Sequence, residues 1–124
     1  MPKPRPKYLN LFQIRLPLPG IVSIMHRVSG AALFLFLPLL LALFEMSLES
    51  AQTFAQFKST MSHWMVKLIV IGLVWAYLHH LCAGIRHLAL DLHYGLELSG
   101  AQTSSYLVLA VSIALTAVAG ALIW

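Results

Sequence analysis

Three long apolar stretches dominate the sequence and limit the folds open to it. They cover about residues 20–48, which include the run AALFLFLPLLLALF, then 64–90 and 104–124, the last without a charged residue. Each is long enough to cross a bilayer core, which takes about 20 helical residues. In lipid a spanning segment must satisfy its own backbone polar groups, as a helix does. The sequence therefore predicts an all-α membrane protein, with three transmembrane helices in a single domain over residues 1–124.

Composition supports a membrane location. The chain has 124 residues, of which 60% are hydrophobic and 10% charged, and its mean hydropathy is +0.83. A soluble domain of this size could not enclose so much apolar surface. The first stretch follows a basic amino terminus, as a signal peptide would, but its apolar run is too long for a signal core and two further spans follow. We therefore expect the first stretch to stay in the mature protein.

Lysine and arginine positions predict the orientation in the membrane. With the amino terminus in the cytoplasm, only Lys58 and Lys67 fall near the far side. The other six basic residues lie on or near the cytoplasmic side: Lys3, Arg5, Lys7, Arg15, Arg27 and Arg86. Because short cytoplasmic segments are enriched in Lys and Arg, the amino terminus is predicted inside and the carboxy terminus outside. The net charge of +4 is thus a topology signal, with no reason to invoke nucleic acid. The segment HYGLELSGAQTSS is predicted to connect the second and third helices.

The stretch HHLCAGIRHLALD, residues 79–91, places polar side chains on the second helix. At 100° per residue, one face carries His80, Gly84, His87 and Asp91. Gly84 on that face leaves space for a neighbouring helix, the commoner use in membranes, or for a flat cofactor. His80 lies deepest in the apolar core, where a polar group is costly, and is the strongest site candidate. Interfacial anchoring is the expected role of four other residues: His79, His93, Trp64 and Trp124.

A second polar cluster, GIVSIMHRVSG, opens the first helix at residues 20–30. Ser23, Arg27 and Gly30 share a face, and His26 flanks it. In antiparallel neighbours this start lies beside the end of the second helix, so the two clusters should converge. Ser23 and Arg27 could bind a carbonyl or carboxylate together, although a lone arginine at a helix start usually snorkels to lipid headgroups.

The single cysteine, Cys82, excludes an intrachain disulfide, a CxxC metal site and a covalent c-type haem attachment. We expect Cys82 to be a small packing residue. Any cofactor must be held by other side chains.

Three motifs carry a family resemblance. RPKYLNL at 5–11, SIMHRVS at 23–29 and HLCAGIRHLALD at 80–91 resemble the cytochrome b membrane-anchor subunits of proteobacterial succinate dehydrogenase, respiratory complex II. The resemblance covers the whole chain and includes its length and the short, charge-free third helix. Two residues depart from the family pattern. Leu90 stands where a methionine or aromatic residue commonly precedes the aspartate. His79 adds a second histidine beside His80, the residue that matches the family's haem ligand.

The resemblance implies roles for several residues. Ser23 and Arg27 would help form the ubiquinone pocket. His26 and Arg27 would lie near the haem propionates, with His87 a further cofactor-binding residue. His80 would be an axial ligand of the iron of haem b.

The resemblance also implies partners. A second small anchor subunit would supply the other axial histidine, which makes the chain part of a heteromeric helical bundle in the bacterial inner membrane. The chain has no flavin or iron–sulfur motif, so succinate oxidation would occur on soluble flavoprotein and iron–sulfur subunits. Asp91 and the loop after it would contact the iron–sulfur subunit, although a solvated helix-end charge is an equally good interpretation of Asp91.

Two other functions compete with this expectation. A small transporter or channel subunit could use the histidines to relay protons or bind a metal. It would need a polar path through the bilayer, whereas the apolar stretch of the third helix, residues 106–124, carries Ser112 and Thr116 as its only serine and threonine. A purely structural anchor without haem is the third possibility.

Overall fold

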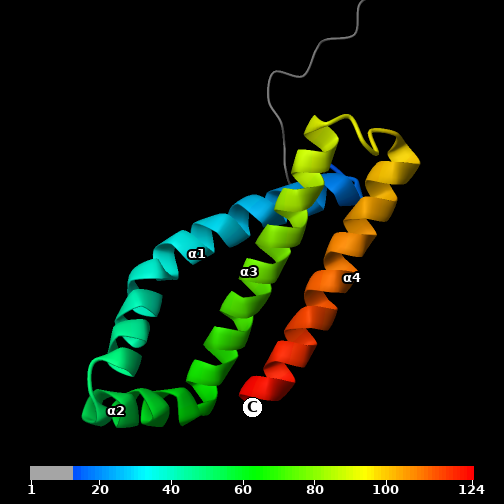
Figure 1. Ribbon diagram of the computed structural model, residues 1–124. Helices are drawn as coiled ribbons and strands as arrows, with labels where there is room; N and C mark the ends of the chain where they lie inside the picture. Colours follow the sequence, from blue (N-terminus) through cyan, green and yellow to red (C-terminus); the bar gives the residue numbers. More distant parts are fainter. Residues whose placement is uncertain (1–12) are drawn as a thin grey trace, which may run out of the picture.

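A computed structural model describes residues 13–124, and Figure 1 shows its path. Residues 1–12, which include Lys3, Arg5, Lys7 and the motif at 5–11, lie outside the described residues. The described part is helical and contains no strand: α1 (Leu18–Leu48), α2 (Ala51–Ser62), α3 (Trp64–Asp91) and α4 (Leu98–Ile123). Of these, α1, α3 and α4 are long and apolar enough to cross a membrane. The predicted fold class is confirmed.

The first span, α1, is bent. It begins after Pro17, with a second proline, Pro19, in its first turn, where a missing N–H costs nothing. Pro38 lies inside the helix, where it removes a main-chain hydrogen bond and its ring clashes with the preceding turn. Figure 1 shows α1 crossing α3 obliquely, diverging from it and then bending toward α2.

A short helix, α2, joins α1 to α3 and was not predicted. It is defined by a capping box in which the Ser50 side chain accepts from the Thr53 N–H at 3.1 Å, and Thr53 Oγ1 accepts from the Ser50 N–H at 3.0 Å. Threonine in place of the usual glutamate or glutamine makes this signal easy to miss in the sequence. Figure 1 shows α2 lying across one end of the bundle, where it spans the separation between α1 and α3.

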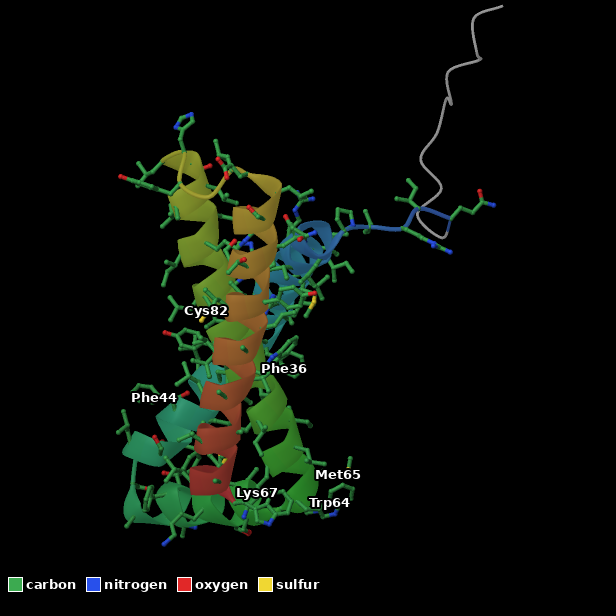
Figure 2. All side chains as sticks on the ribbon, turned by 90° about the vertical axis from the view of Figure 1, so that its right-hand side faces the viewer. Phe36, Phe44, Trp64, Met65, Lys67 and Cys82 are labelled. Carbon is green, nitrogen blue, oxygen red and sulfur yellow. The ribbon has the colours of Figure 1, made fainter. Side chains whose placement is uncertain are left out.

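The helices α3 and α4 pack antiparallel along their length. Near one end Arg86 bonds Ser104, and near the other Lys67 donates to the Trp124 carbonyl at 2.9 Å, with its ammonium 5.3 Å from the Trp124 ring centroid. Figure 2 shows Lys67 and Trp64 close to α2, with Cys82 farther along α3.

The connection between α3 and α4 is shorter than predicted. The expected connection over 93–105 is wrong in its second half, because α4 begins at Leu98. The hydroxyls of Ser104 and Ser105 both donate to the Ala101 carbonyl, so these polar residues are satisfied inside the helix. The short loop turns through His93 and Gly95, whose φ angles are 65° and 72°.

The centre of the bundle is packed with small and medium-sized apolar side chains. Val22 of α1, Ala83 of α3 and Val108 of α4 form the buried cluster, and Cys82 packs against it, which confirms the expected packing role of Cys82. Most large apolar side chains point outward instead, as suits a chain surrounded by lipid. Trp64 and Trp124 are both exposed near the α2 end, and His93 is exposed in the opposite loop.

Candidate functional site: three histidines between α1 and α3

Three histidines from two helices meet where α1 crosses α3. The His26 ring stacks on the His80 ring, with centroids 4.1 Å apart and planes inclined by 10°. The ring of His87 is tilted against His26 at a centroid distance of 5.0 Å. Together they line an open cavity of about 450 Å³, whose other walls are Gly84 and three apolar residues: Leu81, Ile85 and Leu88. The expected convergence of the two clusters is thus observed for these histidines.

The hydrogen bonding of His80 determines which of its nitrogens is free. His80 Nδ1 lies 3.0 Å from the main-chain carbonyl oxygen of His26. A carbonyl can only accept, so Nδ1 carries the hydrogen and donates it. Nε2 then has a lone pair, and it makes no hydrogen bond within residues 13–124. This is the arrangement in which a histidine binds a metal, with one nitrogen anchored and the other available.

Two glycines make room around the histidines in different ways. A Cβ built on Gly30 would lie 2.7 Å from His80 Cε1, so Gly30 is needed for the His80 ring to fit against α1. A Cβ on Gly84 would meet only His26 Nε2, at an ordinary 3.5 Å. Gly84 is therefore not required for helix packing here, and its missing side chain widens the cavity. Of the two uses considered for Gly84, the geometry favours clearance.

Ser23 and Arg27 stand apart from the histidine cavity. Ser23 is half-buried and Arg27 exposed, and neither lines the cavity. Their side chains make no hydrogen bond to any described residue. They lie on α1 beside His26, on a surface open to a ligand or to another chain. Asp91, at the end of α3, is exposed.

His79 occupies a different place from the one expected. Instead of anchoring at an interface, it is completely buried and stacks on Trp75, with centroids 5.2 Å apart. The reason is the orientation of α3, whose stripe of Ala76, His79, Ala83 and Arg86 faces the other spans. The Val22 backbone approaches the ring, but neither ring nitrogen has a hydrogen-bond partner of ordinary geometry among the described residues.

Arg86, counted in the sequence only as a basic charge, joins two spans. Its Nε donates to Ser104 Oγ at 2.9 Å and its Nη2 to the Ala101 carbonyl at 3.4 Å, and only 8% of the residue is exposed. Its place on the same helix stripe as Ala83 and Ala76, three and ten residues earlier, was the available signal. Arg86 ties the cavity-bearing helix α3 to the start of α4.

The donor set at the cavity suits a planar, largely apolar group better than a bare ion. Within residues 13–124, no three His, Cys, Asp or Glu side chains are arranged to hold a metal ion. The cavity is lined by three imidazole rings, of which that of His80 has a nitrogen without a hydrogen bond, and by aliphatic side chains. A haem needs an axial nitrogen and apolar surroundings, so the residues present fit it. These features define a small three-span integral membrane protein with a histidine site between two spans.

Comparison with known proteins identifies the family. The family model described as "Succinate dehydrogenase/Fumarate reductase transmembrane subunit" matches residues 1–119. The chain is 39% identical to a succinate dehydrogenase cytochrome b556 subunit of Coxiella burnetii, over 97% of each chain. It is 38% identical to the subunit of the same name from Paracoccus denitrificans, over 90% of this chain and 85% of that one. The protein belongs to this family and is a non-catalytic membrane-anchor subunit of the succinate dehydrogenase complex.

Proposed function

We propose that this chain holds haem b at the histidine cavity, with His80 Nε2 as one axial ligand of the iron. The single observation that carries the proposal is the hydrogen bond from His80 Nδ1 to the His26 carbonyl, which leaves Nε2 unprotonated. The relatives are named cytochrome b556 subunits, which supports a b-type haem here. When bound, the haem would supply one-electron chemistry.

The chain itself offers one axial histidine at this cavity. His26 and His87 stack and tilt against the site and are suited to hydrogen bonds with the haem propionates, together with Arg27. The second axial position would be filled by a histidine of a second small anchor subunit. The open side of the cavity gives such a partner access.

Ser23 and Arg27 would form this chain's part of a ubiquinone site. Their hydroxyl and guanidinium groups are one helical turn apart on α1 and are not engaged with described residues. Donors of this kind stabilise the negative charge that develops on a quinone oxygen during reduction. Arg27 would then serve both groups, since it follows His26 directly.

The end of the bundle with the histidines would face the cytoplasm. Lys58 and Lys67 lie at the α2 end, whereas Arg15, Arg27 and Arg86 lie toward the other end. This distribution favours a cytoplasmic histidine end and a periplasmic α2 in the bacterial inner membrane. Asp91 and the loop before α4 would then meet the iron–sulfur subunit, with the flavoprotein beyond it.

A transporter or channel would need polar groups along a path through the bilayer. The buried polar residues of α4 are Ser105 and Ser112, and the hydroxyl of each donates to a carbonyl of its own helix. Such hydroxyls satisfy themselves and do not form a relay with the histidine cavity. The one-sided position of the cavity favours a cofactor site.

The test is the haem spectrum of the assembled complex. In His80→Ala we expect loss of the wild-type axial ligation in optical and electron paramagnetic resonance spectra, with haem measured per flavin in the assembled fraction. The matched control is His79→Ala, one residue away, which should keep the wild-type ligation in whatever fraction assembles. Unchanged ligation in His80→Ala would refute the assignment.

A further inference from the structure

We propose that Ser29 is a positioning residue that sets the strength of the bond between His80 Nδ1 and the His26 carbonyl, and thereby the electron donation of His80 to a bound iron. This inference rests on the proposed role of His80 as ligand. It concerns Ser29 and Gly30 of α1, neither of which lines the cavity.

Two side chains donate to one main-chain carbonyl at this place. Ser29 Oγ donates to the His26 carbonyl at 2.8 Å, and His80 Nδ1 donates to the same oxygen at 3.0 Å. The direct approach of Ser29 Oγ to His80 Nδ1, at 3.3 Å, is longer and therefore weaker. Ser29 is 4% exposed, so water has little access to replace its hydroxyl. The His26 carbonyl thus divides its accepting capacity between a serine and the ligand histidine.

Competition for the carbonyl would reach the iron through the imidazole. A stronger bond from Nδ1–H gives the ring more anionic character and makes Nε2 a stronger donor. A stronger donor stabilises the oxidised iron and lowers its reduction potential. The serine hydroxyl weakens the Nδ1–H bond, so its presence would keep the potential higher than the same carbonyl would without the serine.

Gly30 completes the holding site from the same helix. The His80 ring occupies the volume of a Gly30 side chain, since a Cβ there would lie 2.7 Å from Cε1 and 3.2 Å from Nδ1. The close approach keeps Nδ1 within reach of the His26 carbonyl. Ser29 and Gly30, which are adjacent on α1, therefore both contact the His80 ring or the carbonyl that it bonds.

The first experiment compares two serines of α1 in the assembled complex. Ser29→Ala should lower the haem midpoint potential in a redox titration while haem per flavin stays near wild type. Ser47→Ala is the matched control, because Ser47 Oγ also donates to a carbonyl three residues back, that of Phe44, but this bond is exposed and involves no histidine. Ser29→Thr, which keeps the hydroxyl, should restore the potential. A potential equal to that of the control, or a higher one, would overturn the inference.

The second experiment tests the space behind His80. Gly30→Ala should displace the ring and change the electron paramagnetic resonance g-values or reduce haem per flavin. Gly72→Ala is the control, since a Cβ at this helical glycine meets nothing within 4 Å. Identical spectra for the two variants would contradict the holding site.

The two proposals fail in different ways. If His80→Ala retains wild-type axial ligation, the proposed function is wrong. If His80→Ala loses it while Ser29→Ala matches Ser47→Ala and Gly30→Ala matches Gly72→Ala, His80 is the ligand but Ser29 and Gly30 do not position it.

Discussion

His26 holds His80 in two ways at once. The His26 ring lies parallel to the His80 ring at 4.1 Å, and the His26 carbonyl accepts the His80 Nδ1 hydrogen at 3.0 Å. One contact covers a face of the imidazole and the other fixes its edge. The plane of the His80 ring is therefore set by α1, although His80 belongs to α3.

The His26→Ala variant separates these two contacts. The substitution removes the stacked ring but keeps the main-chain carbonyl, so His80 should remain a ligand while its ring gains freedom to rotate. We expect retained axial ligation with broadened or shifted g-values in electron paramagnetic resonance. Loss of ligation as complete as in His80→Ala would show that the stack, and not the carbonyl, holds the ligand.

Ser23→Ala and Arg27→Leu should each impair electron transfer to ubiquinone. Loss of a donor to developing oxyanion charge costs about 2.7–4 kcal/mol in well-characterised sites, so a rate loss of about two orders of magnitude is the upper expectation. Arg27→Leu should be the more severe because Arg27 also neighbours the haem site. The measurement is quinone reduction beside succinate oxidation with an artificial acceptor, on one flavin-normalised preparation. Parallel losses in both assays would indicate poor assembly and reject the quinone role.

The orientation can be read by labelling with a membrane-impermeant thiol reagent. In a Cys82→Ser background, Gln52→Cys in α2 should react from the periplasm of intact cells. Tyr94→Cys, in the exposed loop at the other end, should react only after permeabilisation. The reversed pattern would invert the topology and remove the iron–sulfur contact proposed for the loop.

Replacement of His79 should reveal the cost of its unpaired nitrogens. His79→Phe keeps a ring against Trp75 and removes two buried nitrogen atoms without partners. A buried polar group without a hydrogen bond destabilises a fold by about 1–3 kcal/mol. We expect His79→Phe to match or exceed the thermal stability of wild type. His79→Ala, which leaves a void, should be less stable than both. Equal destabilisation by both substitutions would mean that the imidazole nitrogens are paired in the assembled complex.

The bond between Arg86 and Ser104 should stabilise the pairing of α3 with α4. Ser104→Ala removes the acceptor of Arg86 Nε and should cost about 1.5–3 kcal/mol, the usual range for a hydrogen bond to a charged group. The neighbouring Thr103→Ala, at an exposed position, is the control. Thermal unfolding of the assembled complex measures both. Equal midpoints for the two variants would show that this bond contributes nothing.

Much of the fold follows from hydrophobic length alone. The predicted spans begin within about six residues of α1, α3 and α4, because about 20 apolar residues leave few alternatives in lipid. The start of α4 was missed because Ser104 and Ser105 look like loop residues, yet their hydroxyls bond a carbonyl within the helix. The helix α2 was missed because a polar interfacial segment has no such length constraint.

The candidate site was only partly predictable. The shared face of His80, Gly84 and His87 follows from helical periodicity and is found in the cavity wall. The burial of His79 and the close fit of His80 against Gly30 depend on how α1 crosses α3. The periodicity of one helix gives no information on that crossing. Pairing of Arg86 with Ser104 likewise depends on the register of two helices.

The position of α2 has a consequence for the order of assembly. Its 12 residues amount to a rod of about 18 Å at 1.5 Å per residue, fixed by its own capping box between α1 and α3. A helix at this place fixes the separation between the end of α1 and the start of α3, and it does so with contacts of this chain alone. The surface that a second subunit would bind is therefore preorganised, so its binding energy would not be reduced by the cost of separating the two helices.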